Sequence, residues 1–356
     1  DGDLFLVDRR AMSFTRLTET SEAERSPRFS SDGTRILFVR GDNVFSMSLE
    51  GAGLHQITDI RSGSPPGDDP EARGHKRFLE AQQEELFQHI RRLSAEQEER
   101  EAEREARGEG DPEPFYIPRG ERVQSLQPDP SGRYVAVTLS KPGDGAERTI
   151  VPRWVTESGY TEDLNVRTKV GDAQSVSRIG ILDSATGALT WLDLYPADDV
   201  PADEDEETEE AGGAGHPDLS IAAFGGWNDA GTLGLLFSVS YDNKTRWLHV
   251  VDAVTGETTL LDTLHDEAWV AGPCFFGCTG WLPGTDRVYY VSEASGFAHL
   301  YAINADGSEP AQLTDGDWEV LRVQIPEDRE RFLLHTNEGS PFNQHVYTMR
   351  FDGSRR

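Results

Sequence analysis

Short apolar runs separated by polar turns recur along this chain and predict repeated β-structure. The clearest unit spans residues 26–59, where an Asp32-Gly33 turn precedes the apolar run 36–39 and a second run at 44–47 leads to Gln-Ile-Thr-Asp at 56–59. Asp and Asn side chains bond to their own backbone, and Gly adopts positive φ at no steric cost. These residue types therefore predict tight turns that open each strand of the unit.

Weaker copies of this unit indicate the architecture. Its first half returns at residues 129–132, 227–231 and 281–286, its second half at 183–193, 252–262 and 304–315, and Leu-Thr-like ends at Leu17, Ile57, Leu261 and Leu313. Short strands in repeats of roughly 40–50 residues are typical of four-stranded blades around a central channel. A β-sandwich, the alternative, does not explain the recurring strand order. We therefore predict an all-β fold, a β-propeller with about five to six blades in this chain.

Two insertions interrupt the predicted propeller domain, which spans residues 1–356. Residues 75–107 are expected to be helical, because apolar residues recur there at spacings of three and four; they are Phe78, Leu79, Leu86, Phe87, Ile90 and Leu93. Residues 198–215 combine an acidic run with Gly-Gly-Ala-Gly and are expected to form a disordered loop. Long excursions from blade turns cost little closure entropy.

Composition excludes two classes of partner. The formal net charge is −30, which repels phosphate backbones, so nucleic-acid binding is not expected. No apolar run approaches the roughly 18 residues that a membrane-spanning helix needs.

The first residues, Asp1 to Asp8, start inside a strand-like pattern without a leader, so the propeller is expected to be incomplete at its N-terminus.

Motifs of catalysis are missing from the sequence. It contains no Gly-x-Ser-x-Gly elbow and no His-Glu-x-x-His, and its nine histidines are scattered. We therefore assign no catalytic residue, metal or cofactor to this chain. His299, on a predicted strand, is expected to be satisfied by hydrogen bonds at a blade junction. Trp247, Trp269, Trp281 and Trp318 are expected to pack between blades.

The two cysteines, Cys274 and Cys278, are too few for a disulfide framework and lack the second ligand pair of a structural zinc site. Buried thiols and one short-loop disulfide are the two alternatives, and we expect thiols.

Residues 290–322 carry the strongest resemblance to a known family. They resemble the Ser-Glu-x-x-Gly-x-x-His-Leu-Tyr and Leu-Thr-x-Gly-x-Trp-Glu-Val motifs of the propeller domain of dipeptidyl peptidase IV-like serine peptidases, in the prolyl oligopeptidase family. Residues 246–270 and 335–354 support the resemblance. It implies a propeller of seven to eight blades in the full protein, over an α/β-hydrolase domain that supplies the Ser, Asp and His and is absent from this chain.

The resemblance also suggests substrate-binding residues. The family's propeller holds the substrate's free amine with adjacent glutamates on a short helical excursion, and the insertion at 75–107 falls at about that place with Glu84 and Glu85. Its Trp-Val lead is missing here, so the alternative is a pair of solvated helix carboxylates. At residues 154–171 only Lys169 and Gly171 match the family's Tyr-Pro-Lys-x-Gly string. This departure suggests a bacterial-type subgroup and leaves the substrate preference open.

The expected function is therefore that of a propeller which gates and orients peptide substrates for a serine peptidase, without a catalytic triad of its own. Expected partners are the peptide substrate, the C-terminal hydrolase domain of the same polypeptide and, as an option, a second copy in a homodimer. A secreted or periplasmic location is implied by the resemblance only. The alternative function is a stand-alone TolB-like propeller that acts as a protein-binding scaffold.

Overall fold

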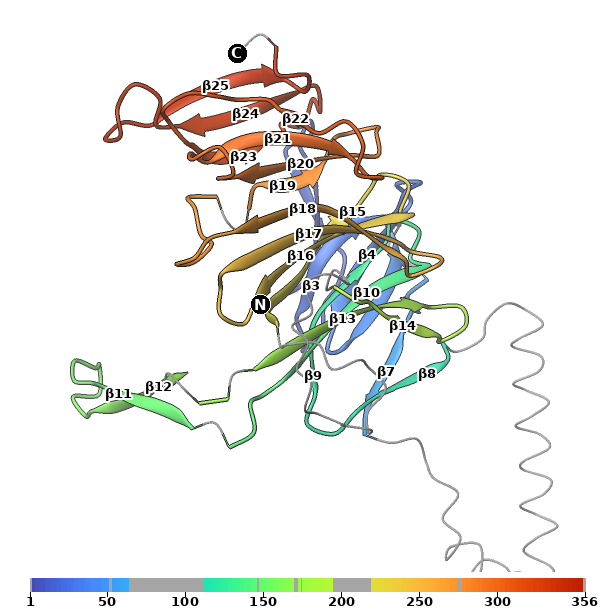
Figure 1. Cartoon of the computed structure of the whole chain (residues 1–356). Coiled ribbons are helices and arrows are strands. Elements are labelled where there is room, and N and C mark those ends of the chain that lie inside the picture. Colours follow the sequence, from blue (N-terminus) through green and yellow to red (C-terminus); the bar gives the residue numbers. More distant parts are fainter. Residues whose placement is uncertain are drawn as a thin grey trace, which may run out of the picture.

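The computed structural model describes residues 2–50, 53–63, 112–145, 147–169, 172–173, 175–194, 219–274 and 277–354. These residues form a succession of antiparallel sheets, stacked face to face in chain order from β3 to β25 (Figure 1). The predicted all-β fold with four-stranded sheets is thereby confirmed. The expected helix at 75–107 and loop at 198–215 lie outside the described residues. Within the described ranges no helix has the length and apolar character needed to cross a membrane.

Five sheets make up the body of the molecule. The first contains β3 (Glu24–Phe29), β4 (Arg35–Arg40), β5 (Asn43–Ser48) and β6 (His55–Gln56). The second contains β9 (Arg122–Pro128), β10 (Tyr134–Lys141), β13 (Val176–Asp183) and β14 (Leu189–Trp191). The third contains β15 (Leu219–Trp227), β16 (Leu233–Ser240), β17 (Thr245–Asp252) and β18 (Thr258–His265). The fourth contains β19 (Thr279–Trp281), β20 (Arg287–Ser292), β21 (His299–Asn304) and β22 (Ala311–Gln312). The fifth, of three strands, contains β23 (Val320–Gln324), β24 (Arg331–Thr336) and β25 (His345–Arg350).

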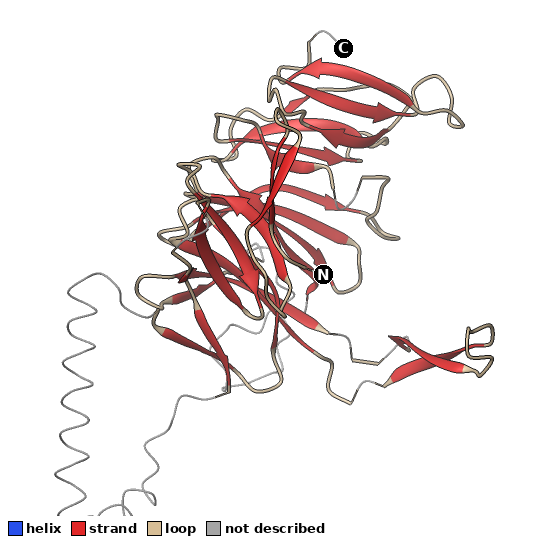
Figure 2. Ribbon diagram, turned by 180° about the vertical axis from the view of Figure 1, so that it is seen from behind, coloured by secondary structure: helices blue, strands red, loops and turns tan. Residues whose placement is uncertain are grey.

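Three strand pairs lie outside these sheets. They are β1 (Phe5–Asp8) with β2 (Ser13–Arg16), β7 (Asp59–Ser62) in parallel with β8 (Pro114–Ile117), and β11 (Arg148–Arg153) with β12 (Glu162–Thr168). The hairpin β11–β12 is inserted between β10 and β13 and projects away from the body (Figures 1 and 2). The sequence pattern did not predict this hairpin.

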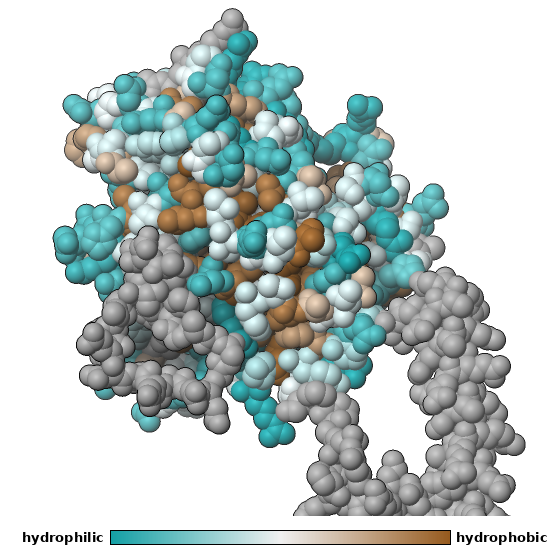
Figure 3. Space-filling view, turned by 45° about the vertical axis from the view of Figure 1, so that its right-hand side comes forward, coloured by the Kyte–Doolittle hydropathy of each residue, from teal (hydrophilic) through white to brown (hydrophobic). Residues whose placement is uncertain are grey.

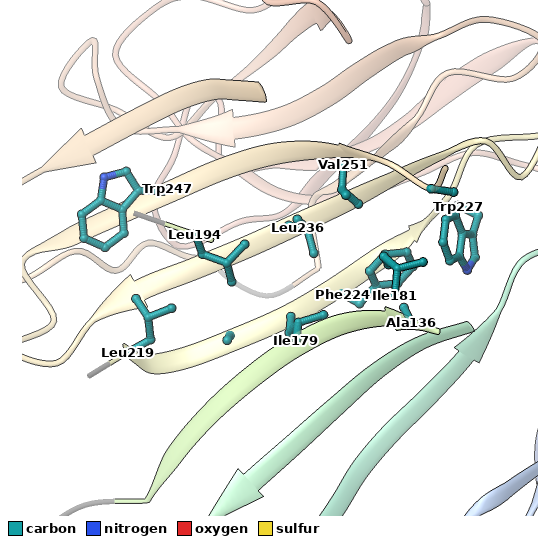
Figure 4. Packing of buried hydrophobic residues seen from close by; sticks show 12 residues of the cluster. Ala136, Ile179, Ile181, Leu194, Leu219, Phe224, Trp227, Leu236, Trp247 and Val251 are labelled. Carbon is teal, nitrogen blue, oxygen red and sulfur yellow. The ribbon is translucent and has the colours of Figure 1, made fainter. Parts of the chain in front are cut away.

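The core lies between neighbouring sheets. In the cluster between the second and third sheets, Ile179 and Ile181 of β13 pack with Leu236 of β16 and Trp247 of β17 (Figure 4). Similar clusters join the third sheet to the fourth and the fourth to the fifth. In the space-filling view, apolar residues gather in the middle of the visible face, with hydrophilic residues around them (Figure 3). Each sheet is therefore stabilised mainly by burial against its neighbours.

The turns between first and second strands use the predicted chemistry. Asp129 accepts the backbone N–H groups of Ser131 and Tyr134 at 2.9 and 2.8 Å. Asn228 accepts those of Thr232 and Leu233 at 3.0 and 3.1 Å. The glycine in each turn has a positive φ of 79° or 73°. These observations confirm the predicted roles of Asp, Asn and Gly in the repeat.

A buried threonine explains the recurrent Leu-Thr ends. Thr314, after β22, accepts the N–H of Leu300 at 2.9 Å, and its Oγ1 lies 3.1 Å from His299 Nδ1. His299 Nε2 lies 3.0 Å from the carbonyl oxygen of Gly316. Because that carbonyl only accepts, Nε2 carries the proton, and Nδ1 accepts the threonine hydroxyl. We call this arrangement the threonine lock; it ties the outer strand to the start of the third strand.

The same lock recurs in the first sheet. Thr58 accepts the N–H of Val44 at 2.9 Å and donates to Asn43 Oδ1 at 3.0 Å, while Asn43 Oδ1 also accepts the N–H of Ile60 at 2.6 Å. Asn43 thus replaces His299. Each of these polar groups is buried or half-buried. A group of this kind without a hydrogen-bond partner would destabilise the fold by about 1–3 kcal/mol, and the lock provides the partners.

Candidate functional site

One end of the sheets collects the loops that follow β16, β20 and β24. Each of these loops joins the second strand of its sheet to the third, so in a stack of antiparallel sheets they all emerge at the same end of the strands. Residues 241–244, 293–298 and 337–344 therefore lie on one side, together with the arm that follows β10. The arm and the β24–β25 loop both project to the left in Figure 1. Several aromatic side chains are exposed in these loops and in the β18–β19 connection; they are Tyr241, Trp269, Phe297 and Phe342.

Two half-buried glutamates lie at this end of the fourth and fifth sheets, where the charge of one acts on the other. Glu293 directly follows β20, and Glu319 directly precedes β23. Burial raises the pKa of Glu293 above its ordinary value, and the nearby carboxylates of Glu319 and Asp266 raise it further. Gly272 lies against this carboxyl group, so closely that a Cβ there would approach its Cδ to 3.2 Å. We call Glu293 and Glu319 the glutamate pair.

Glu319 is held by Asn337 through three hydrogen bonds. Its N–H donates to Asn337 Oδ1 at 2.6 Å, Asn337 Nδ2 donates to Glu319 Oε2 at 3.1 Å, and the N–H of Asn337 donates to the Glu319 carbonyl oxygen at 3.2 Å. These three hydrogen bonds fix the position of Glu319 at the start of strand β23. A carboxylate held in place by hydrogen bonds is preorganised to receive a cationic group.

A buried arginine supports the other member of the pair. Arg246 on β17 forms an ion pair with Asp262 of β18 and donates to the carbonyl oxygen of Val291 at 2.8 Å, two residues before Glu293. Its charge lowers the pKa of Glu293, but burial and the carboxylate of Glu319 each raise that pKa more strongly. The charged groups that act on Glu293 are thus the carboxylates of Glu319 and Asp266 and a single arginine, an arrangement that suits an ammonium group.

Comparison with known proteins finds a family model that is similar to this region. A family model described as "Dipeptidyl peptidase IV (DPP IV) N-terminal region" matches residues 222–356, which include β16 to β25 and the glutamate pair. Residues 222–356 match the dipeptidyl peptidase IV N-terminal region. The resemblance noted at residues 290–322 is confirmed, because these residues lie within the part of the chain that is similar to the N-terminal region of dipeptidyl peptidase IV.

Curated relatives agree with this assignment. The probable dipeptidyl peptidase 4 of Emericella nidulans is 25% identical over 198 residues, covering 54% of this chain and 24% of the relative. That of Aspergillus flavus is 30% identical over 107 residues, covering 28% of this chain and 14% of the relative. The chain thus spans about a quarter of the first of these relatives.

A solved structure supports the fold. The crystal structure of Porphyromonas gingivalis dipeptidyl peptidase 4 aligns with 98% of this chain and 40% of its own, with a TM-score of 0.58 and 16% identity. At this identity the alignment establishes a shared propeller-like fold.

The glutamates expected to bind substrate in a dipeptidyl peptidase IV propeller, Glu84 and Glu85, lie outside the described residues. The glutamate pair was missed, although Ser-Glu and Trp-Glu-Val at these positions belong to the motifs that carried the resemblance. The available signal was that each motif contains a carboxylate. Among the described residues no group of three or more His, Cys, Asp or Glu could hold a metal ion.

Three expectations about other residues have clear outcomes. His299 is satisfied within the threonine lock, as predicted. Trp247 and Trp318 are buried, but Trp269 is 66% exposed, so its predicted packing between blades is wrong; it lies in a loop beyond the end of β18. Cys274 and Cys278 form a disulfide in the structure, and the expectation of free thiols is wrong. Their Cα atoms, 5.5 Å apart, lie within ordinary disulfide range.

Replacing Glu293 with glutamine is expected to stabilise the protein at pH 7–8, raising Tm by about 1–2 °C. A carboxyl group whose pKa is raised on folding favours its protonated form, so wild-type stability falls as pH rises from the unfolded pKa of Glu through the folded pKa. The gain should vanish below about pH 4. Thermal unfolding across this pH range checks it, with exposed Glu22→Gln as control; a gain that is independent of pH would contradict the raised pKa.

Proposed function

We propose that this chain is the propeller portion of a dipeptidyl peptidase IV-like serine peptidase, which gates and orients peptide substrates for an α/β-hydrolase domain of the same polypeptide. The observation that carries the proposal is the family match over residues 222–356, in which the motifs build defined structure: the threonine lock and the glutamate pair. Hydrolysis itself belongs to the hydrolase domain, because this sequence has no nucleophile elbow.

The charge of the chain supports a role in handling peptides with a free amine. The net charge of −30 attracts cationic groups, and carboxylates in a partly shielded environment bind an ammonium group by charge-assisted hydrogen bonds. We further propose that Glu84 and Glu85 anchor the substrate's N-terminal ammonium. Two carboxylates that hold the end of the peptide also fix how far the chain reaches toward the reacting centre.

The double variant Glu84→Gln with Glu85→Gln, in the full polypeptide, is expected to lose about 30-fold to several thousand-fold in kcat/KM on a dipeptide amide with a free amine. This range corresponds to roughly 2–5 kcal/mol for removing one side of a buried charge pair. Steady-state kinetics on a fluorogenic dipeptide substrate measure it.

Glu98→Gln with Glu99→Gln is the matched control, because it neutralises another adjacent glutamate pair of the same segment. The control should keep wild-type kinetics. Equal kinetics for the two double variants would reject the anchoring role while leaving the family assignment intact. A full polypeptide that turns over no dipeptide substrate would instead favour the stand-alone binding scaffold.

A further inference from the structure

The disulfide between Cys274 and Cys278 joins two residues with different surroundings. Cys278 immediately precedes β19 and is 1% exposed, within the cluster that joins the fourth sheet to the fifth. Its Sγ accepts the backbone N–H of Val323 on β23 at 3.2 Å. Cys274 packs against the same cluster but is only half-buried. One half of the disulfide is therefore enclosed and hydrogen-bonded, and the other half lies nearer the surface.

The segment that leads to this disulfide covers one side of Glu293. It begins at Val270, which is buried and donates its N–H to the carbonyl oxygen of Asn243 at 2.8 Å. Gly272 follows with a φ of 118°, and its backbone is so close to Glu293 that an added Cβ would lie 3.3 Å from both carboxylate oxygens. Residues 271–274 belong to no strand. Their position is therefore set by the buried Val270 at one end and by the disulfide at the other.

The surroundings of the two cysteines favour thiol–disulfide exchange from one side. Exchange depends on access to the sulfur that is attacked and on the stability of the other sulfur as a leaving thiolate. Cys274, being half-buried, is the accessible member. Attack there makes Cys278 the leaving group, and the N–H of Val323 points at its sulfur and stabilises the negative charge. An external thiolate is therefore expected to attack Cys274.

We propose that the disulfide Cys274–Cys278 is a redox switch, and that its reduction by a dithiol releases residues 271–274 from Glu293. The first thiolate of the dithiol forms a mixed disulfide with Cys274 and displaces the thiolate of Cys278. The second thiol of the reductant then attacks its own bound sulfur and displaces Cys274. The S–S bond of the protein breaks and that of the reductant forms, and the two electrons and two protons lost by the dithiol appear in the two cysteine thiols.

The expected consequence is local. Reduction removes the covalent tie at the C-terminal end of residues 271–274, whereas the packing of Cys278 between the fourth and fifth sheets does not depend on the bond. The backbone of Gly272 can then move away from Glu293, which becomes more accessible to water and to ligands. The switch thus adjusts the exposure of one member of the glutamate pair. It goes beyond the proposed function and does not require it, because the disulfide and Glu293 belong to the same chain.

Chemical labelling of Glu293 tests the switch. The full chain is incubated with and without dithiothreitol under native conditions, and its carboxylates are coupled to glycine ethyl ester with a carbodiimide. Peptide mass spectrometry then gives the labelling rate of each glutamate. Reduction should raise the rate at Glu293 about threefold or more, and leave the rate at Glu121, a half-buried glutamate before β9, unchanged. Equal rates at Glu293 in the oxidised and reduced chains would overturn the proposal.

The variant Cys274→Ser separates the disulfide from other effects of the reductant. It cannot form the bond, and it leaves the buried Cys278 in place. It should therefore show the raised labelling of Glu293 without dithiothreitol and no further change when dithiothreitol is added. A variant that labels Glu293 at the rate of the oxidised wild type would contradict the switch.

Trapping of the mixed disulfide tests the direction of attack. Reduced glutathione has a single thiol, so its exchange with the folded chain stops at the mixed disulfide, which acid quenching preserves for peptide mapping. Glutathione should be found on Cys274, and the free thiol on Cys278. Glutathione on Cys278, or a disulfide that reacts only after the chain is unfolded in urea, would show that the folded protein contains no such switch.

Discussion

Replacing Thr314 with valine is expected to lower the free energy of unfolding by about 2–4 kcal/mol. The substitution keeps the size and β-branching of the side chain but removes the oxygen that accepts the N–H of Leu300 and bonds His299 Nδ1. Both of those groups are buried, so each loses its partner without access to water. Urea unfolding followed by tryptophan fluorescence measures the loss.

Two controls separate the lock from other effects of the substitution. Thr314→Ser keeps the hydroxyl and should retain most of the stability, whereas Thr263→Val, at an exposed position of β18, should change it by less than about 0.5 kcal/mol. Thr58→Val removes the equivalent lock of the first sheet and should cost a similar amount to Thr314→Val. If Thr314→Val and Thr314→Ser were equally stable, the hydroxyl would have no role in the lock.

Acidification is expected to destabilise the protein through His249, by up to about 3 kcal/mol. His249 lies on β17, facing the second sheet on the same side as Trp247 and Val251, and is 3% exposed. Burial lowers its pKa from 6.5 to about 4, against a smaller opposing effect of Asp193. Among the described residues no side chain or backbone group bonds its Nδ1.

The sign follows from the lowered pKa. Folding favours neutral His249, so the stability that it contributes is fully present above pH 6.5 and is lost as pH falls from there through about 4. A His249→Leu variant should lack this loss, so the difference between its unfolding free energy and that of the wild type should change by about 3 kcal/mol between pH 7.5 and pH 4.

Urea unfolding of the wild type and of His249→Leu at a series of pH values checks the prediction. Because both proteins are compared in the same buffer, the effect of protonating the carboxylates that they share cancels in the difference. His265→Gln, at an exposed histidine of β18, should follow the wild-type curve. Parallel curves for His249→Leu and the wild type would show that His249 is not the titrating group.

Much of the fold could be predicted because its signals are local. Asp129 and Asn228 act on backbone groups within five residues, so their turns are written in a few consecutive letters. The same holds for the repeated Leu-Thr ends, whose recurrence indicates blades without revealing what Thr58 and Thr314 bond. Within each strand, apolar and polar residues alternate because successive side chains point to opposite faces of the sheet.

The candidate site could be predicted only in part. The motif at residues 290–322 pointed to the correct family region, but not to the environment of its glutamates. Glu293 and Glu319 belong to different sheets, and their effect on each other depends on how those sheets pack. The exposure of Trp269 has the same origin, because a tryptophan in a loop is buried only when another element covers it.

The sequence alone determined the all-β class, the turn chemistry and the resemblance of residues 290–322 to the dipeptidyl peptidase IV N-terminal region, since each depends on residue types at fixed short spacings. Only the tertiary structure decided the partners of His299, the burial of His249, the disulfide between Cys274 and Cys278, and the projection of β11–β12 from the body. The physical reason is that burial and charge interactions act through space. Residues far apart in the chain acquire them only when the sheets stack.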